Sequence, residues 1–198
     1  MARCGLHRRH LSSPRSAVCV GFDSSLEVQS GANGSTEALT PGQVRVKVSA
    51  AAINFADILQ CKGKYQEVKN PPFVPGAECS GEIIEVSDAA ASQFAIGDKV
   101  LCFGNGGAFS SHMVASSSSC VRIPAEYADQ VSLQDGAALM VTYGTAHLAL
   151  TAKGKLAEGE VVLVTAAAGG VGLACCELAK NMVRTGFAIF SISGLSCW

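Results

Sequence analysis

A glycine-rich turn near the C-terminal end of the sequence is the strongest candidate for chemistry. Residues 162–180 are VLVTAAAGGVGLACCELAK, and from Ala167 the spacing AAGGVG follows the pattern A-x-G-x-x-G, a relaxed dinucleotide-binding motif. In such a turn the middle glycine lets backbone amides approach a diphosphate, and the last one lets a helix pack against the strand. A purely structural turn is the alternative. The motif predicts a nucleotide site formed by Ala167, Gly169, Gly170, Val171 and Gly172.

This site needs a strand before the turn and a helix after it, and the local pattern supplies both. The apolar run 161–165 predicts a buried strand, and the alanine-rich run after Gly172 predicts a helix. The segment FAIFSIS permits a second strand, so 161–193 suffices for one βαβ unit of about 30 residues. After Ser193 only GLSCW remains, which leaves no fourth strand and no charged residue to bind a ribose or its phosphate.

A two-stranded parallel sheet with one helix would leave part of its apolar surface uncovered. Parallel strands are normally covered by helices on both faces. We therefore expect an exposed apolar side that includes Val162, Val164, Phe187 and Ile189, and low stability for the C-terminal third of the chain.

The first two thirds of the chain have a pattern of short strands and turns that is typical of a small β-barrel. In VRVKVSAAAINF the residues Val44, Val46 and Val48 alternate with Arg45, Lys47 and Ser49, which predicts a half-buried strand. Further short strands, split by glycine and proline turns, are expected in AVCVGF, SGEIIEV, FAIGDKVLCFG, GGAFSSHMVA and CVRIP.

Helical segments are expected at three places in this part of the chain. The stretch 56–61 fits one short helical turn. Ser132 is a candidate N-cap for a helix over 133–140, and 141–150 continues as an apolar, helix-compatible stretch.

Composition excludes several classes of function. The chain has 198 residues, enough for one large or two small domains, and its formal net charge of −1 gives no electrostatic case for binding nucleic acid or an anionic membrane. No uninterrupted apolar run reaches the ~18 residues of a membrane span. The nine cysteines are scattered, without any C-x-x-C pair, and indicate free thiols in a reducing compartment.

Three single features leave alternatives open. The start MARCGLHRRHLSSPRSA is rich in Arg and Ser and free of acids, which fits either a mitochondrial transit peptide or an ordinary frayed N-terminus, so the compartment is mitochondrial or cytoplasmic. Cys175 and Cys176 lie near a helix N-terminus, which lowers a thiol pKa, but a buried helix face is the alternative. His112 and His147 fit satisfied residues of the core or its rim.

Residues 17–181 resemble one family over almost their whole length. The segments AAAINFADILQCKGKY, PFVPGAECSGEIIEV, SLQDGAALMVTYGTAHLAL and VLVTAAAGGVGLA are similar, in this order, to the zinc-independent quinone oxidoreductase (zeta-crystallin-like) branch of the medium-chain dehydrogenase/reductase family. The resemblance implies a mixed β and α/β fold. It places a GroES-like catalytic barrel at 17–140, and a linking helix with an incomplete Rossmann βαβ unit at 141–198. Residues 1–16 would be the transit peptide or a disordered start.

The resemblance also implies a cofactor, a substrate class and site residues. Positions that hold metal ligands in zinc-binding members are Asn54 and the segment PGAE here, which implies no metal. The implied cofactor is NADPH and the implied substrate a small quinone or enone. Asn54 would lie beside the nicotinamide, Tyr65 would line the cleft and donate to the reduced oxygen, and Thr142 would contact the cofactor. Leu59 stands where some relatives have a second tyrosine.

The residues alone allow other functions. Asn54 after a strand fits a turn residue, and Tyr65 fits a surface anchor. We expect a C-terminally truncated member of the family, impaired in catalysis, whereas full-length relatives form homo-oligomers. The alternatives are a non-catalytic isoform that acts as a binding or regulatory module or is degraded, and a structural role like that of a lens crystallin.

Overall fold

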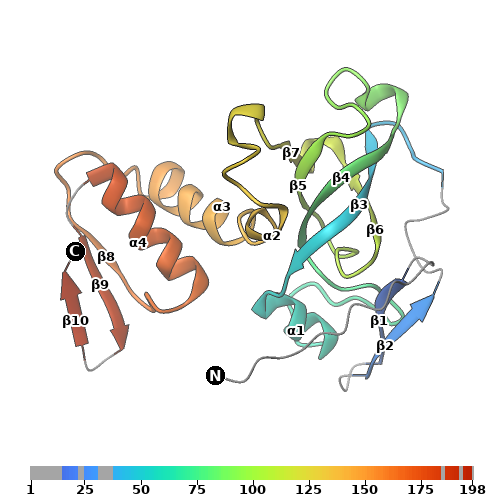
Figure 1. The fold of residues 1–198 in the computed structure, drawn as a ribbon. Coiled ribbons are helices and arrows are strands. Elements are labelled where there is room, and N and C mark those ends of the chain that lie inside the picture. Colours follow the sequence, from blue (N-terminus) through green and yellow to red (C-terminus); the bar gives the residue numbers. More distant parts are fainter. Residues whose placement is uncertain (1–14, 22–24, 31–37, 184–185, 192–193, 198) are drawn as a thin grey trace.

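The chain folds into a β-rich part, a set of bridging helices and a small α/β part. The computed structural model describes residues 15–21, 25–30, 38–183, 186–191 and 194–197. Helices α2 and α3 lie between the large sheet and the α/β part (Figure 1). Of the segment 1–16, proposed as a transit peptide, positions 1–14 lie outside the described residues. The domain boundaries given above remain a prediction.

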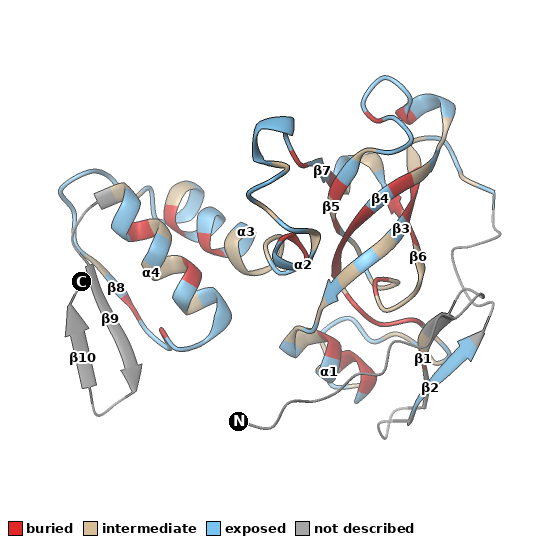
Figure 2. Ribbon diagram, in the orientation of Figure 1, coloured by how far each residue is buried: buried red, intermediate tan, exposed pale blue. Residues whose placement is uncertain are grey.

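The large sheet is antiparallel and has the strand order β6-β3-β4-β5-β7. The strands are β3 (Gln43–Ala52), β4 (Glu78–Val86), β5 (Lys99–Phe103), β6 (His112–Ser116) and β7 (Cys120–Arg122). Each overlaps a segment whose pattern predicts a strand, and β3, β4 and β6 extend slightly beyond it. Buried residues concentrate on β3, β4 and β5 (Figure 2), and Val44, Val46, Ile83 and Val100 are fully buried in the main core.

A hairpin of two strands precedes this sheet. Strand β1 (Arg15–Gly21) pairs antiparallel with β2 (Ser25–Ser30). The amide of Ala17 donates to the carbonyl of Phe109 over 2.8 Å, and the side chain of Val18 is buried. The hairpin is therefore attached to the barrel. Strand β2 has no counterpart in the sequence expectations.

The alternating pattern of β3 is only partly correct as a guide to burial. Val44 and Val46 are buried as expected, but Arg45, assigned to the outer face, is 5% exposed. Arg45 faces Glu85 in the register of β3 and β4, and its Nε donates to Glu85 Oε2 over 2.7 Å. A charged side chain is buried here because it is paired.

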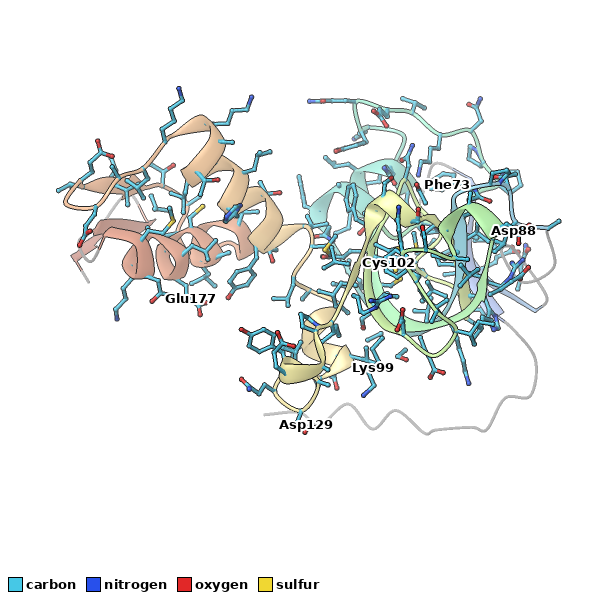
Figure 3. All side chains as sticks on the ribbon, turned by 90° about the horizontal axis from the view of Figure 1, so that it is seen from above. Phe73, Asp88, Lys99, Cys102, Asp129 and Glu177 are labelled. Atoms are coloured by element: carbon cyan, nitrogen blue, oxygen red, sulfur yellow. The ribbon has the colours of Figure 1, made fainter. Side chains whose placement is uncertain are left out.

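Three cysteines lie in register across adjacent strands. Cys79 on β4 faces Cys102 on β5, which in turn faces Cys120 on β7. All three side chains are buried, and the Sγ atoms of Cys102 and Cys120 are 3.5 Å apart. Cys102 lies within the barrel in Figure 3. The six cysteines for which the structure gives a state are free, as expected for this part of the chain.

The helices follow the sequence signals but differ in length. Helix α1 (Phe55–Cys61) is the expected turn, and short 3-10 helices occur at η1 (Asp88–Ala90), η2 (Ser117–Ser119) and η3 (Ala125–Tyr127).

Ser132 caps its helix, because its Oγ accepts from the amide of Asp135 over 3.0 Å. That helix, α2 (Leu133–Gly136), ends four residues before the expected position. Helix α3 (Thr142–His147) continues directly into the π-helix η4 (Leu148–Lys153).

The α/β part contains one more strand than expected. Strand β8 (Val162–Val164), helix α4 (Gly170–Val183) and β9 (Gly186–Ser191) form the βαβ unit with parallel strands. Strand β10 (Gly194–Cys197) pairs antiparallel with β9, so the sheet has three strands in the order β10-β9-β8. The tail GLSC completes a hairpin because it follows β9 directly.

The exposed apolar side of this sheet differs from the expectation. Val164 is 7% exposed because it packs with Ala167 below α4, and Val162 is partly buried against them. Leu163, which points to the opposite face, and Val161 are each 60% exposed. The side chains of Phe187 and Ile189 lie outside the described residues.

Candidate functional site

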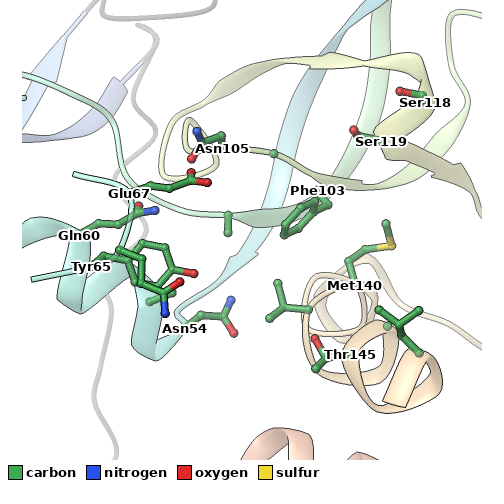
Figure 4. Close-up of a pocket in the computed structure, with 17 residues that line it drawn as sticks. Asn54, Gln60, Tyr65, Glu67, Phe103, Asn105, Ser118, Ser119, Met140 and Thr145 are labelled. Carbon is green, nitrogen blue, oxygen red and sulfur yellow. The ribbon is translucent and has the colours of Figure 1, made fainter. Parts of the chain in front are cut away.

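A cavity of about 860 Å³ opens between the barrel and helix α3. Asn54 is the N-cap of α1, Gln60 lies in its last turn, and Tyr65 follows the helix. Phe103 ends β5. Met140 and Thr145 come from the helical side. Figure 4 shows Asn54 and Tyr65 on one wall and Met140 and Thr145 on the other. The walls therefore belong to segments far apart in sequence.

The loop between β3 and α1 fixes Asn54. Its backbone amide donates to Asp57 Oδ2 over 2.8 Å, so the acid in the first turn closes the start of the helix. Its side-chain nitrogen donates to Glu78 Oε1, also over 2.8 Å. Asn54 is half-buried and Glu78 is fully buried. Asn54 is thus held at both its backbone and its side chain.

Below this loop, Asp57 is buried and Lys69 is half-buried, and the charge of each affects the pKa of the other. Burial raises the pKa of Asp57 above its ordinary value of 3.8, against the opposing effect of backbone amides and of Lys69. Burial lowers the pKa of Lys69, against the opposing charge of Asp57. The Lys69 ammonium also donates to the carbonyl of Asn105. The hydrogen bond from the Asn54 amide makes Asp57 a structural anchor of the loop.

The glycine turn is preserved as a tight bend before α4. The amide of Gly169 donates to the carbonyl of Ala166 over 3.0 Å, and Ala166 has a φ of 51°. A Cβ added at Gly172 would stand 2.7 Å from the Cα of Ala167, so this glycine permits the contact between helix and turn. Gly169 and Gly170 are exposed, and a Cβ at Gly169 would meet only the Ala166 carbonyl oxygen, at 3.4 Å.

These features fit a diphosphate. The space next to Gly169 is open, and the first amides of α4 have no acceptor within their own helix. Ala167 is fully buried and Val171 is 37% exposed, so Ala167 supports the turn from below while Val171 lies at its surface.

Helix α3 connects the cavity to the glycine turn. Gly144 and Thr145 of α3 line the cavity, whereas Thr142 does not. The Thr142 methyl carbon lies 3.1 Å from the position of a Cβ at Gly170, and its hydroxyl donates to the carbonyl of Ala138 over 2.6 Å. Thr142 therefore contacts the turn, and its hydroxyl proton is already engaged.

A side-chain hydrogen bond also joins α3 to α4. The hydroxyl of Tyr143 donates to Glu177, a bond that raises the pKa of Tyr143 above its ordinary value of 10.0. Figure 3 shows Glu177 on α4. Cys175 and Cys176 of this helix are half-buried against the cluster of Val164 and Ala167, and burial raises the pKa of both thiols.

Other candidate residues are placed as follows. The expectation of satisfied core or rim residues holds only for the position of His112, which is partly exposed but has a buried Nδ1 without a hydrogen-bond partner; His147 is exposed. Burial lowers the pKa of His112.

Within the described residues, no group of three His, Cys, Asp or Glu side chains is arranged to hold a metal ion. Among the same residues, no helix has the length and apolar character needed to cross a bilayer.

Sequence reasoning missed Glu78, Phe103 and Thr145. The segment PGAE marks position 78 only as a departure from a metal-binding pattern. Its link to Asn54 and to Val141, 63 residues further along, has no local signal. Phe103 and Thr145 enter the cavity only through the packing of β5 and α3.

Comparison with known proteins defines the class. Residues 40–125 match the alcohol dehydrogenase GroES-like domain. The structure is similar to the human synaptic vesicle membrane protein VAT-1 homolog-like protein, with a TM-score of 0.82, 30% identity, and coverage of 91% of this chain and 57% of that one. The chain belongs to the medium-chain dehydrogenase/reductase superfamily, with a GroES-like domain followed by the beginning of the helical and Rossmann region.

Within that superfamily the chain is similar to quinone oxidoreductase-like proteins. It is 47% identical over 149 residues to a quinone oxidoreductase-like protein 2 homolog of Nematostella vectensis, covering 75% of this chain and 40% of the relative. The quinone oxidoreductase of Thermus thermophilus, known in complex with NADPH, shares 26% identity and a TM-score of 0.71 over 88% of this chain and 52% of its own. The chain thus spans about half the length of these relatives, or less.

Proposed function

We propose that this chain forms the substrate pocket and the diphosphate-binding turn of an NADPH-dependent quinone or enone reductase. One observation carries the proposal: the cavity that contains Asn54 and Tyr65 is lined by α3, and the N-terminus of α3 contacts the exposed glycine turn at Gly170. A site for a dinucleotide beside a small-molecule pocket requires this arrangement. The Thermus thermophilus relative in complex with NADPH supports the choice of cofactor.

The residues of the proposed site have defined roles. Bound NADPH would supply a hydride to the conjugated substrate. The Tyr65 phenol would donate a hydrogen bond to the substrate oxygen that gains negative charge, as in an oxyanion hole. Gly169 and Gly170 would leave room for the diphosphate at the amides of α4. The charge that develops is held by hydrogen-bond donors, and the proposal includes no metal.

Titration of NADPH fluorescence tests the proposal on the chain as it stands. Gly169→Asp is the informative variant, because its Cβ has room in the fold while its carboxylate would repel a diphosphate. Ala91→Asp, at an exposed position outside the cavity and the turn, is the charge-matched control. We expect micromolar binding, retained by the control and weakened at least tenfold, or about 1.4 kcal/mol, in Gly169→Asp. No binding at millimolar NADPH would overturn the proposal.

The alternative of a non-catalytic binding module rests on a different observation. Leu163 and Val161 expose apolar surface on β8, at a face that α4 does not cover. The same titration distinguishes the two functions, since a binding module has no need of NADPH.

A further inference from the structure

Glu78 is a fully buried carboxylate that joins three segments of the chain. It begins β4, and its two oxygens accept hydrogen bonds from different elements. Oε1 accepts from the side-chain nitrogen of Asn54, and Oε2 accepts from the backbone amide of Val141, each over 2.8 Å. These donors lie on opposite sides of the cavity described above, since Asn54 precedes α1 and Val141 precedes α3.

We propose that Glu78 is a positioning residue that sets which atom of Asn54 faces a ligand in the cavity. A carboxylate only accepts hydrogen bonds, so it must face the NH₂ group of Asn54 and not its oxygen. The backbone amide of Asn54 is already bound to Asp57. One N–H of Asn54 is thus bound to Glu78, and its side-chain carbonyl oxygen, which also faces the backbone amide of Asp57 in the capping box of α1, has a second lone pair left to accept from a ligand.

This assignment predicts the chemistry of the ligand group that Asn54 recognises. An acceptor in a partly buried site selects a donor, and an amide NH₂ group is the neutral donor that meets this requirement. The inference rests on the proposed function: the carboxamide of a nicotinamide is such a group, and a quinone, which carries only acceptors, is not. Asn54 would thus contact the cofactor and leave the substrate oxygen to Tyr65.

The second oxygen of Glu78 fixes the opposite wall. Val141 is the N-cap of α3, and no side chain caps this helix start. The carboxylate of Glu78 instead binds the backbone amide of Val141 itself, and the amides of Tyr143 and Gly144 bond to the carbonyl of Leu139. Asn54 and the start of α3 therefore keep a constant separation across the cavity.

The test compares Glu78→Gln with Glu82→Gln, an exposed glutamate on the same strand. The two oxygens of Glu78 face different donors, so a glutamine presents its oxygen to one donor and its NH₂ group to the other, and one hydrogen bond is lost. We expect the NMR signals of the Asn54 side-chain NH₂ and of the Val141 amide to shift in Glu78→Gln. Both signals should stay unchanged in Glu82→Gln. If neither signal moves in Glu78→Gln, the positioning role is wrong.

A kinetic measurement separates positioning from a role in folding alone. With NADPH and an enone, Glu78→Gln should slow the single-turnover rate at saturating cofactor at least about tenfold, because a misplaced cofactor contact acts on the reaction itself. If the single-turnover rate at saturating cofactor is unchanged and only the folded fraction is smaller, the positioning role is wrong. If Glu78→Gln does not fold, Glu78→Asp takes its place, since one methylene less leaves it unable to reach both donors.

The NMR comparison keeps the two proposals separable. If the native chain binds no NADPH, the proposed function fails, while the shifts at Asn54 and Val141 still decide whether Glu78 positions them. If NADPH binds but the Asn54 signals are unaffected by it, the assignment of Asn54 to the cofactor carboxamide is wrong.

Discussion

Replacement of Gly172 by alanine provides the sharpest test of how the glycine turn is built. The added Cβ would stand 2.7 Å from the Cα of Ala167, and the carbonyl of Ala166 is also in contact. Both obstacles are backbone, so no side-chain rotation relieves them. Ala166 already has a positive φ of 51°, which leaves the bend little freedom to move. The first turn of α4 must therefore shift away from β8.

The magnitude follows from two opposing effects. Overpacking of this kind costs about 1–3 kcal/mol. Alanine gains up to about 1 kcal/mol over glycine in a helix interior. We expect Gly172→Ala to lower the free energy of unfolding by up to about 2 kcal/mol, which is the overpacking cost less a gain of about 1 kcal/mol. The loss should be concentrated in the α/β part, because the clash involves only α4 and the bend.

Gly144→Ala is the matched control. Gly144 also lies in a helix, but a Cβ there would have nothing within 4 Å. We expect this variant to be stabilised by about 0.4–1 kcal/mol. Urea unfolding followed by circular dichroism gives the free energies, and hydrogen exchange over 162–183 locates the loss. If Gly172→Ala were as stable as Gly144→Ala, the close contact between helix and turn would not exist.

Three further predictions concern a cap, a histidine and a thiol. Ser132→Ala removes the acceptor of the Asp135 amide and should lower the free energy of unfolding by about 1 kcal/mol in urea; no change would show that α2 needs no cap. Because the pKa of His112 is lowered by folding, the unfolded chain takes up its proton more readily, so stability should fall as the pH drops through 6.5. His112→Gln should flatten that dependence between about pH 7.5 and 5.5, and an unchanged slope would contradict it. Site-resolved alkylation should modify Cys175 slowly at neutral pH and faster as the pH rises, because burial raises its pKa; rapid modification at neutral pH would contradict this.

Local patterns predicted what local physics determines. The cap at Ser132 needs only the residues that follow it, and the packing role of Gly172 needs only the strand and helix on either side. Both are confirmed by the contacts of the structure. The end of α2 was not predictable in the same way, since Gly136 packs against Leu101 of a distant strand.

The misplaced and missed residues depend on partners that are remote in sequence. Arg45 is buried because Glu85 lies opposite it, and alternation along one strand does not show the neighbouring strand. Strand β10 exists because β9 offers an edge to a tail without a clear pattern of its own. Glu78 links residues 24 and 63 positions away, so its function could be recognised only after the fold was known.

The contact between Gly170 and Thr142 has a consequence for protein engineering. The Thr142 methyl occupies the space that a side chain at position 170 would need, and the next residue back, Val141, is bound by Glu78, which also holds Asn54. A designer who transplanted the glycine turn alone into another scaffold would leave behind the parts that relate it to the pocket. These five positions are linked by direct contacts, so they would have to be transplanted together.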